Sequence, residues 1–434
     1  MLFIVALLIQ YAAAGSVFAH YMVGTITQDH ASTDIDDAIS VGRDAFALNV
    51  ISLENWSTNA VSSLFNASSG TNFKLFFSFD MTHFTDPSQF LPLLEQYVGH
   101  ENYFLYDNKP FVSTFDGGSL TFGASDPNSS WMKYFKNNLS TAGIDVFFVP
   151  NFDDAANYPS GFFDSFTVVD GAISWEFVWP NGNAGKANVS DSVDSTMISE
   201  VHTAGKIYMM PLSAFQFKHI DTSQNWYRIG EINLNDAGEG HYIGNFLNES
   251  LGNSDVRSYV DGFDYAGWQQ VIPPFISAYK SGATDPSQIT SSSMTAGGGS
   301  GKLVGVMWYR TLLTTASCSN DSLGKPDNWE NAQDAINYAV ILPDLTNGDN
   351  YGRNYTINVY SNNDMIGSFA GTFGLNGGTV LGLAAGSAES QRVEVVESSN
   401  GVNATTVLIS KGKKDVLSET SGICNYNYEV VAMS

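Results

Sequence analysis

The chain has 434 residues, of which 43% are hydrophobic and 13% aromatic, enough for one large domain or two ordinary ones. Its 44 acidic and 19 basic residues give a net charge of −25. Nucleic acids and anionic membrane surfaces repel a protein of that charge, so we exclude both as partners.

The chain begins with an apolar run at residues 2–11, followed by the small residues Ala12-Ala13-Ala14-Gly15. That order is typical of a signal peptide, and the run is too short to span a bilayer. Nine Asn-X-Ser/Thr sequons follow along the chain. We therefore predict a signal peptide at residues 1–15 and a glycosylated protein secreted to the extracellular space or the cell wall.

Between residues 16 and 286, runs typical of strands alternate with runs typical of helices. The expected strands are 17–25, 47–52, 74–81, 111–115, 145–151, 172–179, 207–217 and 228–234, and the expected helices are 34–45, 58–66, 87–98, 131–142, 161–169 and 191–204. This alternation predicts an α/β fold, a (β/α)8 TIM-type catalytic barrel over residues 16–286. Only residues 218–227 separate the last two strands, so we predict that this crossover helix is missing or vestigial.

The residue composition and the pattern of predicted elements change after about residue 285. Residues 287–301 form a Ser/Gly-rich linker, and residues 302–434 contain short alternating runs separated by Gly, Asn and Asp. That pattern predicts a C-terminal antiparallel β-sandwich as an accessory domain. The two cysteines, Cys318 and Cys424, would staple this region by a disulfide in an oxidising compartment, or else stay as two unpaired thiols.

The strongest indication of an enzyme is the set of carboxylates at the ends of predicted strands. No phosphate-binding glycine loop, zinc motif or nucleophile elbow is found, so we expect no cofactor and no catalytic metal. Cleaving a glycosidic bond needs two carboxyl groups, and a barrel holds them at the carboxyl ends of its strands. Asp80 ends an apolar strand, and Asp236 and Glu239 follow the last strand; Asp153 and Asp154, after the fifth, are weaker candidates.

Aromatic side chains near the same strand ends could stack on sugar rings. They are Trp175 and Trp179 on the sixth strand, Tyr21 on the first and Trp56 after the second. Ordinary core packing is the alternative for each of them. Imidazoles in strand-end segments, His20 and His241, could bond sugar hydroxyls.

At these residues the chain resembles the fungal α-1,3-glucanases (mutanases) of glycoside hydrolase family 71. The matching segments are His20-Tyr21-Met22-Val23-Gly24, Asp36-Asp37-Ala38, Gly42 to Asn49, Phe77 to Met81, Val149-Pro150-Asn151-Phe152, Asp170-Gly171 with Trp175, Asn235-Asp236, Gly238-Glu239 and His241-Tyr242-Ile243-Gly244. The resemblance implies a barrel followed by a sandwich, secretion, and endo-hydrolysis of α-1,3-glucan in fungal cell walls with inversion. It places the catalytic carboxylates at Asp236 and Glu239, with an assisting Asp80.

Asn151 and Tyr242, which lie within the matching segments, complete the expected substrate contacts. We expect Glu239 to act as the acid and Asp236 as the base, on a polysaccharide substrate, in a monomeric protein. Leu234, Ala237 and Gly240 stand where the family usually has Trp, Tyr and Ser. The alternative functions are therefore a catalytically impaired α-glucan-binding barrel and a cell-wall structural protein.

Overall fold

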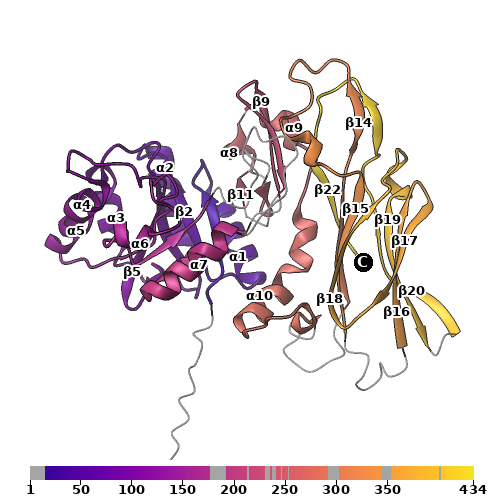
Figure 1. The fold of residues 1–434 in the computed structure, drawn as a ribbon, viewed down its shortest axis with the longest axis horizontal. Coiled ribbons are helices and arrows are strands. Elements are labelled where there is room, and N and C mark those ends of the chain that lie inside the picture. The colour runs from indigo at the N-terminus through magenta and orange to yellow at the C-terminus, as the bar shows by residue number, and fades with distance from the viewer. Residues whose placement is uncertain are drawn as a thin grey trace, which may run out of the picture.

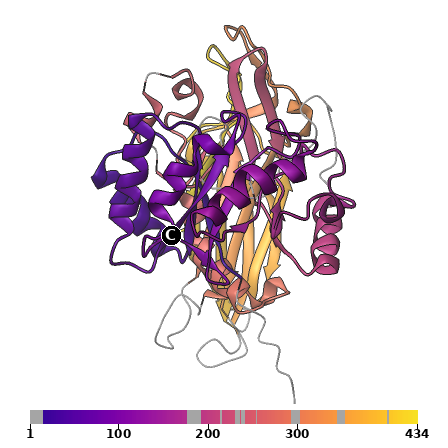
Figure 2. The ribbon, with the colours of Figure 1, turned by 90° about the vertical axis from the view of Figure 1, so that its left-hand side faces the viewer.

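The computed structural model describes residues 15–175, 192–212, 215–229, 235–236, 241–245, 247–252, 254–291, 303–343, 353–399 and 402–434. In Figure 1 a parallel-stranded part (residues 15–212) lies on one side and an antiparallel sandwich (residues 303–434) on the other, with α10 (Ile272–Lys280) between them. The view turned by 90° places the parallel-stranded part in front of the sandwich (Figure 2). Within the described residues, no helix has the length and apolar character needed to cross a membrane.

The parallel strands follow one another in chain order. They are β1 (Phe18–Met22), β2 (Ala45–Val50), β3 (Lys74–Asp80), β5 (Lys109–Phe115) and β6 (Phe147–Phe148), with the short β4 (Leu105–Tyr106) antiparallel to β5. A bridge from Asn151 to Ile173 leads on to β7 (Gly171–Ile173), which pairs in parallel with β8 (Ile207–Met209). This is the strand order of a (β/α) barrel wall. Among the described residues no ladder joins β8 back to β1, so barrel closure stays a prediction.

Helices pack against this sheet and share one apolar cluster with it. They are α1 (Gln28–Ser40), α2 (Asn55–Ser68), η1 (Pro87–Gln89), α3 (Leu91–Tyr97), α4 (Pro127–Trp131), the π-helical turn η2 (Met132–Lys136), α5 (Asn137–Thr141), α6 (Phe162–Ser165) and α7 (Ser192–Ala204). The predicted bounds of the first helix, 34–45, were wrong. Thr27 caps α1 by accepting a hydrogen bond from the His30 backbone N–H, so the helix begins earlier, and Ala45 already belongs to β2.

A hairpin occupies the place of the last predicted crossover. The strands β9 (Phe215–Asp221) and β10 (Gln224–Ile229) pair antiparallel. The predicted strands 207–217 and 228–234 were therefore wrong in part, because β8 ends at Met209 and Ile229 belongs to β10. The reason is the turn: the Asp221 carboxylate accepts hydrogen bonds from the backbone N–H groups of Ser223 (2.7 Å) and Gln224 (3.0 Å). That turn folds the two runs onto each other instead of into the parallel sheet.

The chain then returns to the first strand. β11 (Asn235–Asp236) and β12 (His241–Tyr242) pair antiparallel, and β11 lies against β1. The short helical segments α8 (Asn248–Leu251), α9 (Arg257–Val260), η3 (Ala266–Gln270) and η4 (Pro286–Gln288) follow, with α10 before η4.

The sandwich region has two four-stranded sheets, ordered β18-β15-β13-β22 and β17-β16-β19-β20, and a separate parallel pair, β14-β21. Its strands are β13 (Val304–Arg310), β14 (Leu312–Cys318), β15 (Ala335–Leu342), β16 (Arg353–Ser361), β17 (Asp364–Gly371), β18 (Gly374–Leu381), β19 (Arg392–Ser399), β20 (Val402–Lys411), β21 (Leu417–Thr420) and β22 (Tyr428–Ala432), with the 3-10 turns η6 (Trp329–Asn331) and η8 (Ala388–Ser390). One apolar core fills the space between the sheets. Cys318 and Cys424 are joined by a disulfide with a Cα–Cα distance of 5.5 Å.

Candidate active site

A cavity of about 1100 Å³ lies between the parallel strands and the outer face of the sandwich. His20, Asn151 and Trp175 line it from the parallel strands, and Trp308 and Asn337 line it from β13 and β15. The sandwich is thus one wall of the cavity. Sequence analysis did not predict that contribution, because a strand pattern does not say what its outer face meets.

Three of the predicted substrate contacts come together on the strand side of this cavity. The His20 and Trp175 rings lie 4.5 Å apart between centroids, and Trp175 also meets Phe115 edge-on at 5.6 Å. Asn151 is 1% exposed and bridges two strand ends, since its amide donates to the Ile173 carbonyl (3.2 Å) and its oxygen accepts from the Asp116 N–H (3.3 Å). These bonds fix the amide between the ends of β5 and β7.

Two predicted contacts lie elsewhere. Tyr21 occupies the opposite face of β1 from His20, and its hydroxyl donates to the Asp34 carboxylate at 2.7 Å. Tyr242 is buried, stacks on Tyr265 at 4.1 Å and donates its hydroxyl to the Phe263 carbonyl. Burial holds the pKa of both phenols well above the usual value, so both stay neutral. Neither lines the large cavity.

Of the three carboxylates proposed for catalysis, only the Asp80 side chain lies within the described residues. Asp80 ends β3, is 8% exposed and accepts hydrogen bonds from the backbone N–H (2.9 Å) and the hydroxyl (2.6 Å) of Thr82. Asp236 is described in its backbone, which pairs with His241 in the β11–β12 hairpin. Glu239, Trp179 and the side chains of Asp236 and His241 lie outside the described residues.

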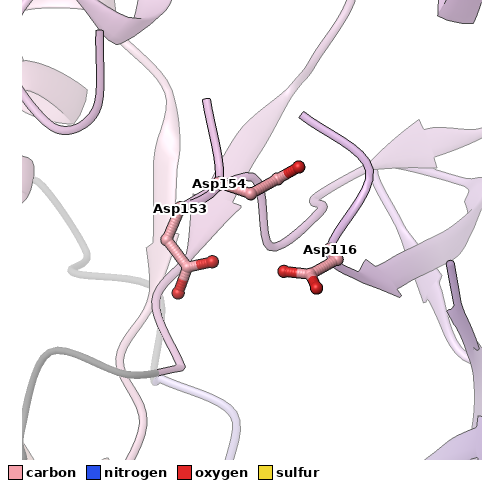
Figure 3. Close-up of side chains that lie close together, drawn as sticks. All are labelled: Asp116, Asp153 and Asp154. Atoms are coloured by element: carbon pink, nitrogen blue, oxygen red, sulfur yellow. The ribbon is translucent and has the colours of Figure 1, made fainter. Parts of the chain in front are cut away.

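Three further acids gather at the ends of β5 and β6, as Figure 3 shows. Asp116, Asp153 and Asp154 each offer an oxygen within 4.8 Å of the others, a donor set that could hold a hard cation. However, Asp154 already accepts the N–H groups of Gly118 (2.7 Å) and Ser119 (2.9 Å), which ties two loops together. Sequence analysis overlooked Asp116, although an acid directly after a strand is the signal that selected Asp80.

Arg43 is a second residue that sequence reasoning did not select. It is 8% exposed, its Nη2 atom has no hydrogen-bond partner among the described residues, and it lines both the large cavity and a small hollow of about 30 Å³ beside Asp37. Burial lowers the pKa of its guanidinium to about 10, and the nearby Asp37 carboxylate opposes that shift. The group stays charged and can donate to a bound ligand.

The comparisons with known proteins agree on one family. The model of "Glycosyl hydrolase family 71" matches residues 13–235 and 231–434. A glucan endo-1,3-alpha-glucosidase of Schizosaccharomyces pombe is 32% identical, over 75% of this chain and 77% of that protein. A mutanase of Penicillium rubens is 30% identical, over 75% and 72%. An ascus wall endo-1,3-alpha-glucanase of S. pombe is 28% identical, over 81% and 82%.

Similarity to solved structures is weaker. A GH99 endo-alpha-mannosidase of Bacteroides thetaiotaomicron reaches a TM-score of 0.38 at 11% identity, over 46% of this chain and 70% of that chain, and carries no argument here. The family match spans nearly the whole chain and confirms the resemblance found in the sequence. The chain therefore belongs to glycosyl hydrolase family 71 and is a glycoside hydrolase.

Proposed function

We propose that this protein hydrolyses α-1,3-glucan of fungal cell walls, acting within the chain and outside the cell. The names of its relatives support this substrate and this location. The observation that carries the proposal is the cavity in which His20, Trp175 and Asn151 meet beside β1. It offers an aromatic face, an imidazole and an amide, the groups that bind a neutral sugar.

The proposed chemistry uses two carboxyl groups. Glu239 protonates the leaving glycosidic oxygen, while Asp236 takes a proton from the water that attacks the anomeric carbon from the other face. The C–O bond to the leaving sugar breaks as the bond to water forms, so the configuration inverts. This mechanism requires the two carboxyl groups to lie about 6.5–9.5 Å apart, with room for the water. Asp80 assists from the end of β3. Support comes from β11, whose backbone lies against β1 and so next to the strand that carries His20.

The test is reducing-sugar release from insoluble α-1,3-glucan. We expect wild type to release sugar and both Asp236→Asn and Glu239→Gln to lose at least about 10²-fold in kcat, because each removes one proton-transfer group. NMR of the first product should show inverted anomeric configuration. Retained activity in either variant would contradict the assigned pair.

A binding protein without hydrolase activity is the second candidate. The β9–β10 hairpin in place of a crossover helix, with Leu234, Ala237 and Gly240 at altered motif positions, favours it. Such a protein would sediment with α-1,3-glucan and release no sugar at any time. If residues 302–434 alone accounted for that sedimentation, a cell-wall structural role would follow.

A further inference from the structure

The first βα unit and the segment after β12 meet at the seam where the barrel would close. On one side lie β1 and α1, and on the other lie residues 243–245 and 247–250, which follow the β11–β12 hairpin. No ladder joins the two sides among the described residues. Side-chain contacts hold them instead.

Asn245 stands at the centre of these contacts. Its one amide group donates to two carboxylates of α1, to Asp34 Oδ1 at 3.0 Å and to Asp37 Oδ2 at 2.8 Å. Asp34 uses its other oxygen to accept the Tyr21 hydroxyl of β1 at 2.7 Å. Both amide hydrogens of Asn245 are thus used, and both bonds have a charged acceptor, which makes them stronger than neutral ones.

Further bonds fasten the same segment on both flanks. Towards α1, Glu249 pairs with His30, and the Ser250 hydroxyl donates to the Thr25 carbonyl at 2.6 Å. Towards η3, Gln269 donates to the Ile243 carbonyl at 2.9 Å. The segment that leaves the hairpin is therefore fixed at several points, and on the side of α1 Asn245 is the one nearest β12.

The short connection before β11 gives this attachment its importance. In an ordinary barrel a crossover helix packed on the sheet would fix the last strand. Here the described residues before β11 form the β9–β10 hairpin, which pairs with itself. The residues that follow β12 then help to set the place of β11 relative to β1, together with the buried Tyr242 of β12 and the contact of β12 with β9.

We propose that Asn245, clamped by Asp34 and Asp37, is a positioning residue that sets the place of the β11–β12 hairpin against β1 and, through it, of the chain at Asp236, the base of the proposed function. This inference rests on the proposed function. It assigns Asn245 no contact with substrate. A displacement of about 1 Å at reacting groups can cost about 10²-fold in rate, so a short link of this kind can control kcat.

The test begins with Asn245→Asp, which sets a third carboxylate against two others. We expect kcat to fall by about 10-fold or more, with KM and the melting temperature little changed. Hydrogen exchange should become faster in peptides covering residues 235–245. In the triple variant Asn245→Asp, Asp34→Asn and Asp37→Asn, the amides on α1 donate and the carboxylate at position 245 accepts. This variant should restore kcat and slow hydrogen exchange again. Asn358→Asp on β16, whose side chain bonds Ser368, makes the same chemical change far from the seam and serves as control.

The outcomes separate cleanly. Unchanged kcat and unchanged exchange in Asn245→Asp would overturn the positioning role. A loss of kcat that the triple variant does not restore would also overturn it. So would a loss of kcat that comes with a fall in the melting temperature of Asn245→Asp, because either result is expected of a residue with a purely structural role. An inactive wild type would overturn the proposed function instead, and the exchange measurement with its rescue would still decide whether Asn245 holds the hairpin.

Discussion

Trp175 is the side chain best placed to meet a sugar ring. It follows β7, packs against His20 and Phe115, and lines the large cavity. Its backbone N–H donates to the Asp153 carboxylate at 3.4 Å, which ties the residue to the end of the preceding strand. The ring is thus held in place before any ligand arrives.

We predict that Trp175→Ala raises KM for soluble α-1,3-linked oligosaccharides about 3- to 10-fold, with a smaller effect on kcat. The reason is that an aromatic contact contributes about 0.5–1.5 kcal/mol beyond burial. Steady-state kinetics measures this. Trp56→Ala is the control, because Trp56 lies on α2, donates to Glu54 and does not line the cavity. An equal KM for Trp175→Ala and wild type would remove Trp175 from the binding site.

At the scale of elements, the β9–β10 hairpin joins the parallel-stranded part to the sandwich. Tyr227 N–H donates to the Asp327 carbonyl at 2.8 Å, and Asn225 donates to the Leu323 carbonyl at 3.3 Å. His219 Nε2 lies 3.0 Å from Asp321 Oδ2, and both side chains are almost fully buried, although the contact is not a well-aligned hydrogen bond. Asp321 also accepts the N–H of Cys424, so the hairpin is attached next to the disulfide.

Asp321→Ala should destabilise the protein by about 1–3 kcal/mol, since it removes the acceptor of the Cys424 and Leu323 N–H groups and the carboxylate beside the buried His219. Chemical denaturation measures the free energy of unfolding. Asp364→Ala, at an exposed position that begins β17, is the matched control and should change that free energy by less than about 0.5 kcal/mol. Equal unfolding free energies for Asp321→Ala and wild type would show that the hairpin is not anchored there.

At the scale of the whole molecule, a strongly acidic chain has buried one of its acids on a strand of the sandwich. Glu429 lies on β22, the strand against which η3 packs, and is 5% exposed. Burial raises the pKa of its carboxyl group to about 7; Lys414 and Lys413 oppose that shift and Asp264 adds to it. In the unfolded chain the same group ionises near its ordinary pKa of 4.5.

Glu429 should therefore make folding pH-dependent. Below pH 4.5 the carboxyl is protonated in both states. As pH rises from 4.5 towards 7 the unfolded state loses the proton first, so stability falls and the loss is complete above pH 7. After discounting for solvent screening, the loss is about 1–2 kcal/mol. We expect Glu429→Gln to match wild type in melting temperature at pH 4 and to exceed it at pH 8. The same difference at both pH values would contradict this.

Much of the parallel-stranded part could be predicted from the sequence. The strand predicted at 74–81 is confirmed as Lys74–Asp80, because a strand buried on both faces is a continuous apolar run wherever it lies. The last predicted strand, 228–234, was wrong at residues 228–229, and residues 230–234 lie outside the described residues. An alternating run looks the same whether its partner is parallel or antiparallel, and the Asp221 turn decided between them.

The candidate site, too, was predicted only in part from the sequence. The sequence by itself determined the family, and it selected Asp80 at the end of β3 and three residues that line the cavity, His20, Asn151 and Trp175, because these depend on local order along the chain. Only the tertiary structure decided that Tyr21 faces α1, that the sandwich walls the cavity, and that Asn245 meets Asp34 and Asp37 across the seam. Those contacts join residues as many as about two hundred positions apart, and local patterns carry no information about which distant surfaces will pack together.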